Sequence, residues 1–190
     1  MNREQIKVFV LTFMAYASLT SLRYGWSYSK VQMHEDIGIS MKSLGVVDAF
    51  YVACYSSGMV VLGSLIHRVS LKRYVVGGIL ASSLSYMFFP ALYAFTGLYS
   101  LPLVVGFMSV NGFFQATGWP GIMGIFGNWF TDTKKGLLMA LWAMSGNIGN
   151  ILSTNVCNVL ENLGFSWVSN FMVTGIFGVA VALCILLFLD

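Results

Sequence analysis

Apolar residues along this chain form six long runs that are separated by short polar stretches. The runs cover residues 6–28, 44–66, 74–95, 99–126, 136–160 and 167–189. Each is long enough to cross a bilayer core as a helix, and the alternating stretches of about ten residues that membrane β-strands require are absent. Because backbone groups in lipid must bond within their own segment, the pattern predicts six transmembrane helices and an all-α membrane protein.

The composition indicates an integral membrane protein and not a soluble domain. The chain is 57% hydrophobic and 9% charged, whereas about a quarter of the residues in soluble domains are charged. The net charge of +3 is small and dispersed, which argues against nucleic acid. Cys54, Cys157 and Cys184 stand singly in apolar runs, which argues against disulfides and a metal site. We expect no cofactor.

Lysine and arginine in the short loops predict the orientation of the chain. The basic residues of one side are Arg3, Lys7, Arg68, Lys72, Arg73, Lys134 and Lys135. The other side has Lys30 and Lys42, together with Glu35, Asp36 and Glu161. We therefore expect both termini to face the cytoplasm and the loop 34–42 to face the lumen or exterior.

An arginine interrupts the first run. A helix over residues 6–28 is roughly 34 Å long, which places Arg23 inside the hydrocarbon, about two turns from one face. A charge there costs on the order of 3 kcal/mol or more and needs a protein or ligand partner. In the alternative interpretation Arg23 reaches the headgroups, and Tyr24, Trp26 and Tyr28 form an interfacial aromatic belt. This stretch alone does not decide between the two.

Polar and small residues mark three further runs. They are Asp48, Tyr51 and Tyr55 on the second, Asn111, Gln115 and Gly118 on the fourth, and Ser145, Gly149 and Ser153 on the fifth. Close helix contact explains most of the glycine and serine positions. Tyr55, Asn111 and Gln115 are bulkier, and such groups in a membrane usually line a wet cavity. Pro120 predicts a bend, because it cannot donate to the Ala116 carbonyl.

The third and sixth runs are interpreted as outer support helices with almost no buried polarity. Runs one, two, four and five then line a central cavity. The order of polar, polar and apolar runs repeats in two units of three helices, which is typical of an inverted 3+3 repeat.

Two stretches resemble a known family. Residues 111–120 read NGFFQATGWP and are followed by GNWF at 127–130 and KKG at 134–136, then by Leu141-Trp142 and Gly149-Asn150-Ile151. Residues 53–59 read ACYSSGM, and residues 63–74 read GSLIHRVSLKRY. Over nearly its whole length the chain resembles the sugar-phosphate exchangers of the organophosphate:phosphate antiporter family, in the major facilitator superfamily. The exchangers of the eukaryotic endoplasmic reticulum look closer than the bacterial carriers.

The resemblance implies that residues 1–190 form the N-terminal six-helix half of a transporter in the endoplasmic reticulum membrane. It implies exchange of a phosphorylated sugar or related organophosphate for inorganic phosphate by alternating access. It further implies that Arg23 binds the substrate phosphate and that Tyr16 and Tyr55 line the cavity, which Asn111 and Gln115 join from their own pattern. A guanidinium suits a phosphate because its fork of N–H groups can bind two oxygens.

The same resemblance assigns a gating role to the basic loop with His67, Arg68, Lys72 and Arg73. The chain also departs from the family pattern at four places. Tyr24 follows the arginine where lysine is common, Met59 replaces a lysine of bacterial carriers, Ser145-Gly146 replaces a histidine, and His67 replaces a loop aspartate.

A major facilitator carrier has two six-helix halves, so we expect a fragment, a truncated product, or a half that pairs with a second half or as a homodimer. The alternative function is a non-transporting membrane protein that pairs with or scaffolds another membrane protein. An enzyme is disfavoured, because His34 and His67 lie in loops on opposite sides and no nucleophile–base pair is visible.

Overall fold

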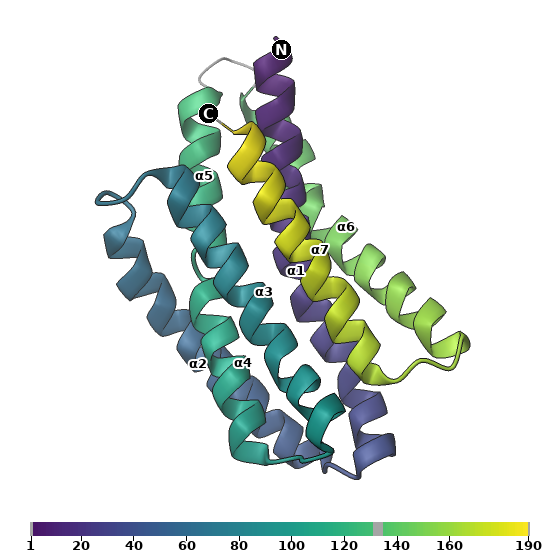
Figure 1. The fold of residues 1–190 in the computed structure, drawn as a ribbon. Coiled ribbons are helices and arrows are strands. Elements are labelled where there is room, and N and C mark those ends of the chain that lie inside the picture. The colour runs from purple at the N-terminus through teal and green to yellow at the C-terminus, as the bar shows by residue number, and fades with distance from the viewer. Residues whose placement is uncertain (1, 131–134, 190) are drawn as a thin grey trace.

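The chain folds as an elongated helical bundle in a computed structural model that describes residues 2–130 and 135–189. Lys134, one of the basic residues used for orientation, lies outside the described residues. Within them no strand occurs. The helices are α1 (Arg3–Ile37), α2 (Met41–Leu65), α3 (Leu71–Thr96), α4 (Leu101–Gln115), α5 (Gly118–Trp129), α6 (Lys135–Asn162) and α7 (Trp167–Phe188). The two ends of the chain lie at the same end of the bundle (Figure 1).

The six predicted runs are present, and the fourth is formed by α4 and α5 together. Among the described residues, α1, α2, α3 and α7 are each long and apolar enough to cross a membrane by length and composition. The other two runs are not among these four helices. The fourth run is divided into two short helices, α4 and α5, and α6 carries several asparagines along its 28 residues. The prediction of an all-α, six-helix membrane fold is confirmed.

The fourth run bends where α4 gives way to α5. Pro120 is the third residue of α5, and it has no N–H to offer the Ala116 carbonyl. Thr117 instead bonds back to the Phe114 carbonyl, through its N–H at 3.1 Å and its Oγ1 at 2.8 Å. The predicted bend is confirmed, one turn before the proline itself.

Helix α1 continues past the end of its apolar run at Tyr28 and stops at Ile37. Gly38 follows with a left-handed φ of 71°, a conformation that glycine adopts without strain and that commonly ends helices. Arg23 is therefore about four turns from the end of α1. The helix is longer than the predicted run of residues 6–28, and the depth of Arg23 in the membrane stays a prediction.

The helices pair in a way that relates the two halves of the chain. Helix α1 packs on α6 and α7, α2 packs on α4, and α3 packs on α4 and α7. If the unit α1–α3 is exchanged with the unit α4–α7, the pair α1 with α6 becomes the pair α4 with α2, and α3 with α7 maps onto itself. This pairing agrees with the 3+3 repeat expected from the order of polar runs.

Small residues of α6 allow close contact with α1. Ser21 Oγ donates to the Gly149 carbonyl at 3.0 Å, and Ser153 Oγ donates to the Ser21 carbonyl at 2.9 Å. A Cβ on Gly149 would lie 2.4 Å from the Ala17 carbonyl oxygen. The predicted role of this stripe in helix contact is confirmed.

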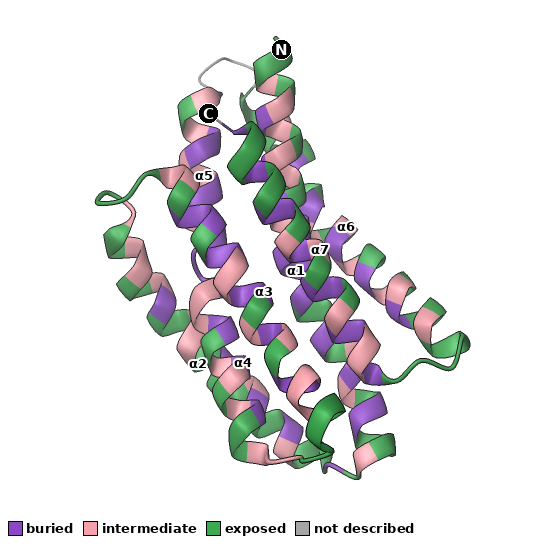
Figure 2. Cartoon of the chain, viewed as in Figure 1, coloured by how far each residue is buried: buried purple, intermediate pink, exposed green. Residues whose placement is uncertain are grey.

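Helices α3 and α7 lie side by side, and α3 is more buried than α2 (Figure 2). They carry four buried polar side chains, Ser82, Ser83, Asn170 and Thr174. Asn170 Nδ2 donates to Gln32 Oε1 at 2.9 Å, so α7 is tied to α1 by a buried polar contact. The prediction that the third and sixth runs carry almost no buried polarity was wrong, because short hydroxyl and amide side chains were counted as part of the apolar pattern.

Candidate functional site

Arg23 reaches from the middle of α1 to residues of α2 and α4. Its Nε donates to Tyr51 Oη at 3.3 Å, and its Nη2 donates to Gln115 Oε1 at 3.1 Å. Tyr51 and Gln115 are 8% and 3% exposed, whereas the arginine side chain itself is exposed. The charge therefore has protein partners on one side and open space on another.

The two contacts leave much of the guanidinium free. A guanidinium carries five N–H donors, and Tyr51 and Gln115 use one on Nε and one on Nη2. Among the described residues no geometric hydrogen bond uses Nη1, although the Tyr55 side chain also lies beside the guanidinium. Since two protein acceptors hold the Nε edge, the group is oriented with its remaining donors available to an anion.

Aromatic rings of α2 lie beside the same charge. Arg23 Cζ lies 5.1 Å from the ring centroid of Tyr55 and 6.0 Å from that of Tyr51. The two rings stack with centroids 6.4 Å apart. Such cation–π contacts stabilise the guanidinium without using its N–H groups.

Gln115 is held in turn by Asn111. Gln115 Nε2 approaches Asn111 Oδ1 at 3.5 Å, and Asn111 Nδ2 donates to the Ser82 carbonyl at 2.8 Å and to Ser82 Oγ at 2.9 Å. Asn111 is 1% exposed. Asn111 is therefore not in contact with Arg23 but lies one step behind it, in a chain of polar contacts that runs from α3 to α1.

Glycines bring α2 and α4 close enough for these contacts. A Cβ on Gly112 would lie 2.6 Å from the Tyr51 carbonyl oxygen, and a Cβ on Gly58 would lie 2.5 Å from the Phe113 carbonyl oxygen. No larger residue fits these two backbones without displacement, so both glycines set the distance between Tyr51 and Gln115.

Tyr16 lies two turns before Arg23 on α1 and faces α5 and α6. Its ring centroid is 5.6 Å from that of Trp119 and 5.1 Å from that of Trp142. A Cβ on Gly146 would lie 3.4 Å from Tyr16 Cε1. Gly146 therefore faces Tyr16, whereas Ser145 is fully buried. Residues from α1, α2, α4, α5 and α6 thus surround the face that carries Tyr16 and Arg23.

The aromatic belt of the alternative interpretation is wrong for Trp26. This residue is 3% exposed, and its Nε1 donates to Asp48 Oδ1 at 2.7 Å. The other carboxylate oxygen of Asp48 pairs with Lys30 Nζ at 2.7 Å. Trp26 therefore takes part in a polar contact between α1 and α2 and does not turn its ring toward lipid.

The basic loop lies between α2 and α3. His67 and Arg68 are exposed residues of the turn that follows α2, and Lys72 and Arg73 stand in the first turn of α3. Among the described residues none of these four has an ion-pair partner.

Sequence reasoning missed the role of Tyr51, which is the hydrogen-bond partner of Arg23 on α2. The helical spacing of Tyr51 and Tyr55 was visible, but the spacing does not reveal which ring is buried against α4. Met59 lies half-buried one turn after Tyr55, and Tyr24 is exposed beside Arg23.

A sequence model described as Major Facilitator Superfamily matches residues 8–190. Putative glycerol-3-phosphate transporter 5 of Arabidopsis thaliana is 27% identical over 98% of this chain and 40% of its own length. Sugar phosphate exchanger 3 of Homo sapiens is 26% identical over 91% of this chain and 40% of its own length. A glucose-6-phosphate exchanger of Bos taurus is 33% identical over 72% of this chain and 28% of its own length.

The resemblance inferred from the two motif stretches is confirmed by these names, each of which describes a transporter or exchanger of a phosphorylated compound. The chain spans about two fifths or less of the length of these relatives.

Proposed function

This chain belongs to the Major Facilitator Superfamily, and we propose that it is the N-terminal six-helix half of a transporter that exchanges a phosphorylated sugar or related organophosphate for inorganic phosphate. The names of its relatives support this substrate class. The observation that carries the proposal is the arrangement of Arg23, which is held on its Nε edge by Tyr51 and Gln115 and makes no other geometric hydrogen bond within residues 2–130 and 135–189.

In this proposal Arg23 binds the phosphate group that both exchanged substrates share. A guanidinium binds two phosphate oxygens at once, and a cavity with little water strengthens the contact. Tyr16 and Tyr55 line the cavity and contact the organic part of the substrate. Gln115 and Asn111 act mainly by holding Arg23 in place, because both are buried and already hydrogen-bonded.

Alternating access requires two bodies that move about a shared site. The face with Arg23 supplies one wall of such a site, so we propose that it is completed by a second six-helix half, or by a second copy of this chain. Polar groups that face acyl chains cost free energy, and this cost also favours a second half or a second copy packed against the face with Arg23.

We propose that both termini face the cytoplasm and that the protein lies in the endoplasmic reticulum membrane. The basic loop with His67, Arg68, Lys72 and Arg73 would then be cytoplasmic and act in gating. The lack of an ion-pair partner for these residues in the described part of the chain supports a loop that is weakly held.

The test is exchange of labelled phosphate into phosphate-loaded vesicles that contain the chain alone, or the chain with a co-expressed C-terminal half of a related exchanger. We expect saturable exchange only for the pair. The variant Arg23→Lys should lower phosphate binding and exchange at least tenfold, because an ammonium loses the fork geometry. The variant Arg3→Lys, at the start of the same helix, should leave both unchanged.

Normal phosphate binding by the folded Arg23→Lys variant would contradict the assignment of Arg23. Saturable exchange by the monomeric chain alone would contradict the need for a second wall. A chain that pairs stably with another membrane protein, and never binds phosphate in that pair, would instead support the scaffold function.

A further inference from the structure

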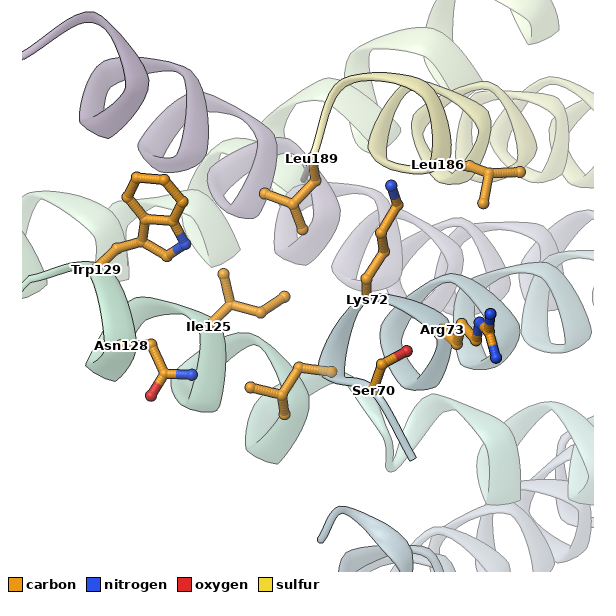
Figure 3. Close-up of a pocket in the computed structure, with 9 residues that line it drawn as sticks. Ser70, Lys72, Arg73, Ile125, Asn128, Trp129, Leu186 and Leu189 are labelled. Carbon is orange, nitrogen blue, oxygen red and sulfur yellow. The ribbon is translucent and has the colours of Figure 1, made fainter. Parts of the chain in front are cut away.

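A pocket of about 710 Å³ lies away from Arg23, where α3 begins and where α5 and α7 end. Much of its lining is apolar and comes from three helices or their ends, through Leu71, Ile125, Trp129, Leu186 and Leu189. Figure 3 shows Ile125 and Trp129 on one side of the pocket and Leu186 and Leu189 on another. It shares no lining residue with the surroundings of Arg23.

The remaining lining is polar and positively charged. Ser70, Lys72, Arg73 and Asn128 contribute it. Lys72 and Arg73 have no ion-pair partner in the described ranges 2–130 and 135–189. In Figure 3 the amino group of Lys72 points away from α3 toward the region between Leu186 and Leu189. Two unpaired cations therefore border an apolar pocket.

The position of the pocket suits a ligand that enters from the membrane. It lies at the end of the bundle that carries both termini (Figure 1), and Leu186 is an exposed residue in the last turn of the apolar helix α7. A free phosphate would leave the apolar walls uncovered. A neutral acyl chain would leave the two cations without a partner.

We propose that this pocket binds one anionic phospholipid. The headgroup phosphate contacts Lys72 and Arg73, and the upper part of an acyl chain lies on Ile125 and Leu186. Basic pockets between transmembrane helices at a membrane surface are suited to acidic headgroups, because charge attraction there adds to burial of the chain. The site gives the bundle a lipid requirement that is independent of substrate binding at Arg23.

The test is native mass spectrometry of the purified 190-residue chain after exchange into micelles with equal amounts of phosphatidylserine and phosphatidylcholine. We expect one retained phosphatidylserine per chain, favoured at least tenfold over phosphatidylcholine. The double variant Lys72→Gln/Arg73→Gln should lose this preference. The double variant Arg68→Gln/Lys135→Gln removes the same charge outside the pocket and should keep it. Helical content by circular dichroism confirms that each variant is folded.

Equal loss in the two double variants would overturn the proposal, because it would show diffuse attraction to a basic surface. Equal retention of the two lipids by the unmodified chain would overturn it as well. A third arm adds millimolar inorganic phosphate, which should not displace the lipid. Displacement would assign the pocket to a soluble anion instead.

Discussion

Tyr51 Oη lies 2.5 Å from Gln115 Oε1, the same oxygen that accepts from Arg23. Because Tyr51 belongs to α2 and Gln115 is the last residue of α4, the orientation of the arginine depends on two helices at once. Neither contact alone defines the plane of the guanidinium, so removal of either should change the direction in which Arg23 points its remaining N–H donors.

Tyr51→Phe should weaken the site more than Tyr55→Phe. Loss of the Tyr51 hydroxyl removes one partner from Arg23 and one from Gln115, at a cost of about 1–3 kcal/mol in stability, and phosphate affinity should fall several-fold. Tyr55 contacts Arg23 with its ring face, which phenylalanine retains. Thermal unfolding and phosphate binding of the two variants check this.

The two phenylalanine variants are matched, since each removes one hydroxyl from the same helix. Equal effects on phosphate affinity would show that the hydroxyl of Tyr51 does not orient Arg23.

Gly149→Ala should destabilise the contact between α1 and α6. The added Cβ would lie 2.1 Å from Thr20 Oγ1 and 2.4 Å from the Ala17 carbonyl oxygen, and overpacking of this kind costs about 1–3 kcal/mol. Gly106→Ala in α4 is the control, because nothing lies within 4 Å of its Cβ position. Unfolding temperatures in detergent should fall for the first and stay level or rise for the second. A tolerated Gly149→Ala would mean that α6 is not held against α1 in solution.

Labelling should place the two loops on opposite sides of the membrane. In a background without Cys54, Cys157 and Cys184, Ser40→Cys should react with an impermeant maleimide only from the lumenal side, and Ser70→Cys only from the cytoplasmic side. The reason is the segregation of basic residues between the two ends. The reverse pattern would overturn the orientation.

His67→Asp should favour the outward-open state of the paired transporter. A carboxylate in this turn would face Arg68, Lys72 and Arg73, which have no ion-pair partner in the described residues, and would hold the cytoplasmic end closed. A cysteine at Gly146 should then react at least threefold more slowly from the cytoplasmic side. His67→Asn tests size without charge and should leave the rate unchanged. Identical rates in all three chains would leave His67 as a solvated loop residue.

The apolar runs predicted the six helical spans, and Pro120 predicted the bend in the fourth span. Both predictions succeed because they depend on local chemistry. The length of α1 was underestimated, since the apolar pattern ends at Tyr28 while the helix needs only a continued α conformation. Gly38 was the available signal for its true end.

The polar interior was harder to predict. Asn111 was expected in a wet cavity, but it bonds to Ser82 on a helix that was taken as apolar. Which helix face meets which neighbour is decided by packing between distant segments, and a single sequence does not contain that information. The face with Arg23 could be predicted because a charge in an apolar run has few tolerable positions.

The break between α4 and α5 lies immediately after Gln115. Because the helix is interrupted there, a rotation of α5 about this point would leave Gln115 nearly fixed. A rotation of about 10° would displace the far end of α5, roughly 18 Å away, by about 3 Å. Movement of the membrane-surface end of the fourth span by about the width of a water molecule would therefore be compatible with intact contacts between Arg23, Tyr51 and Gln115.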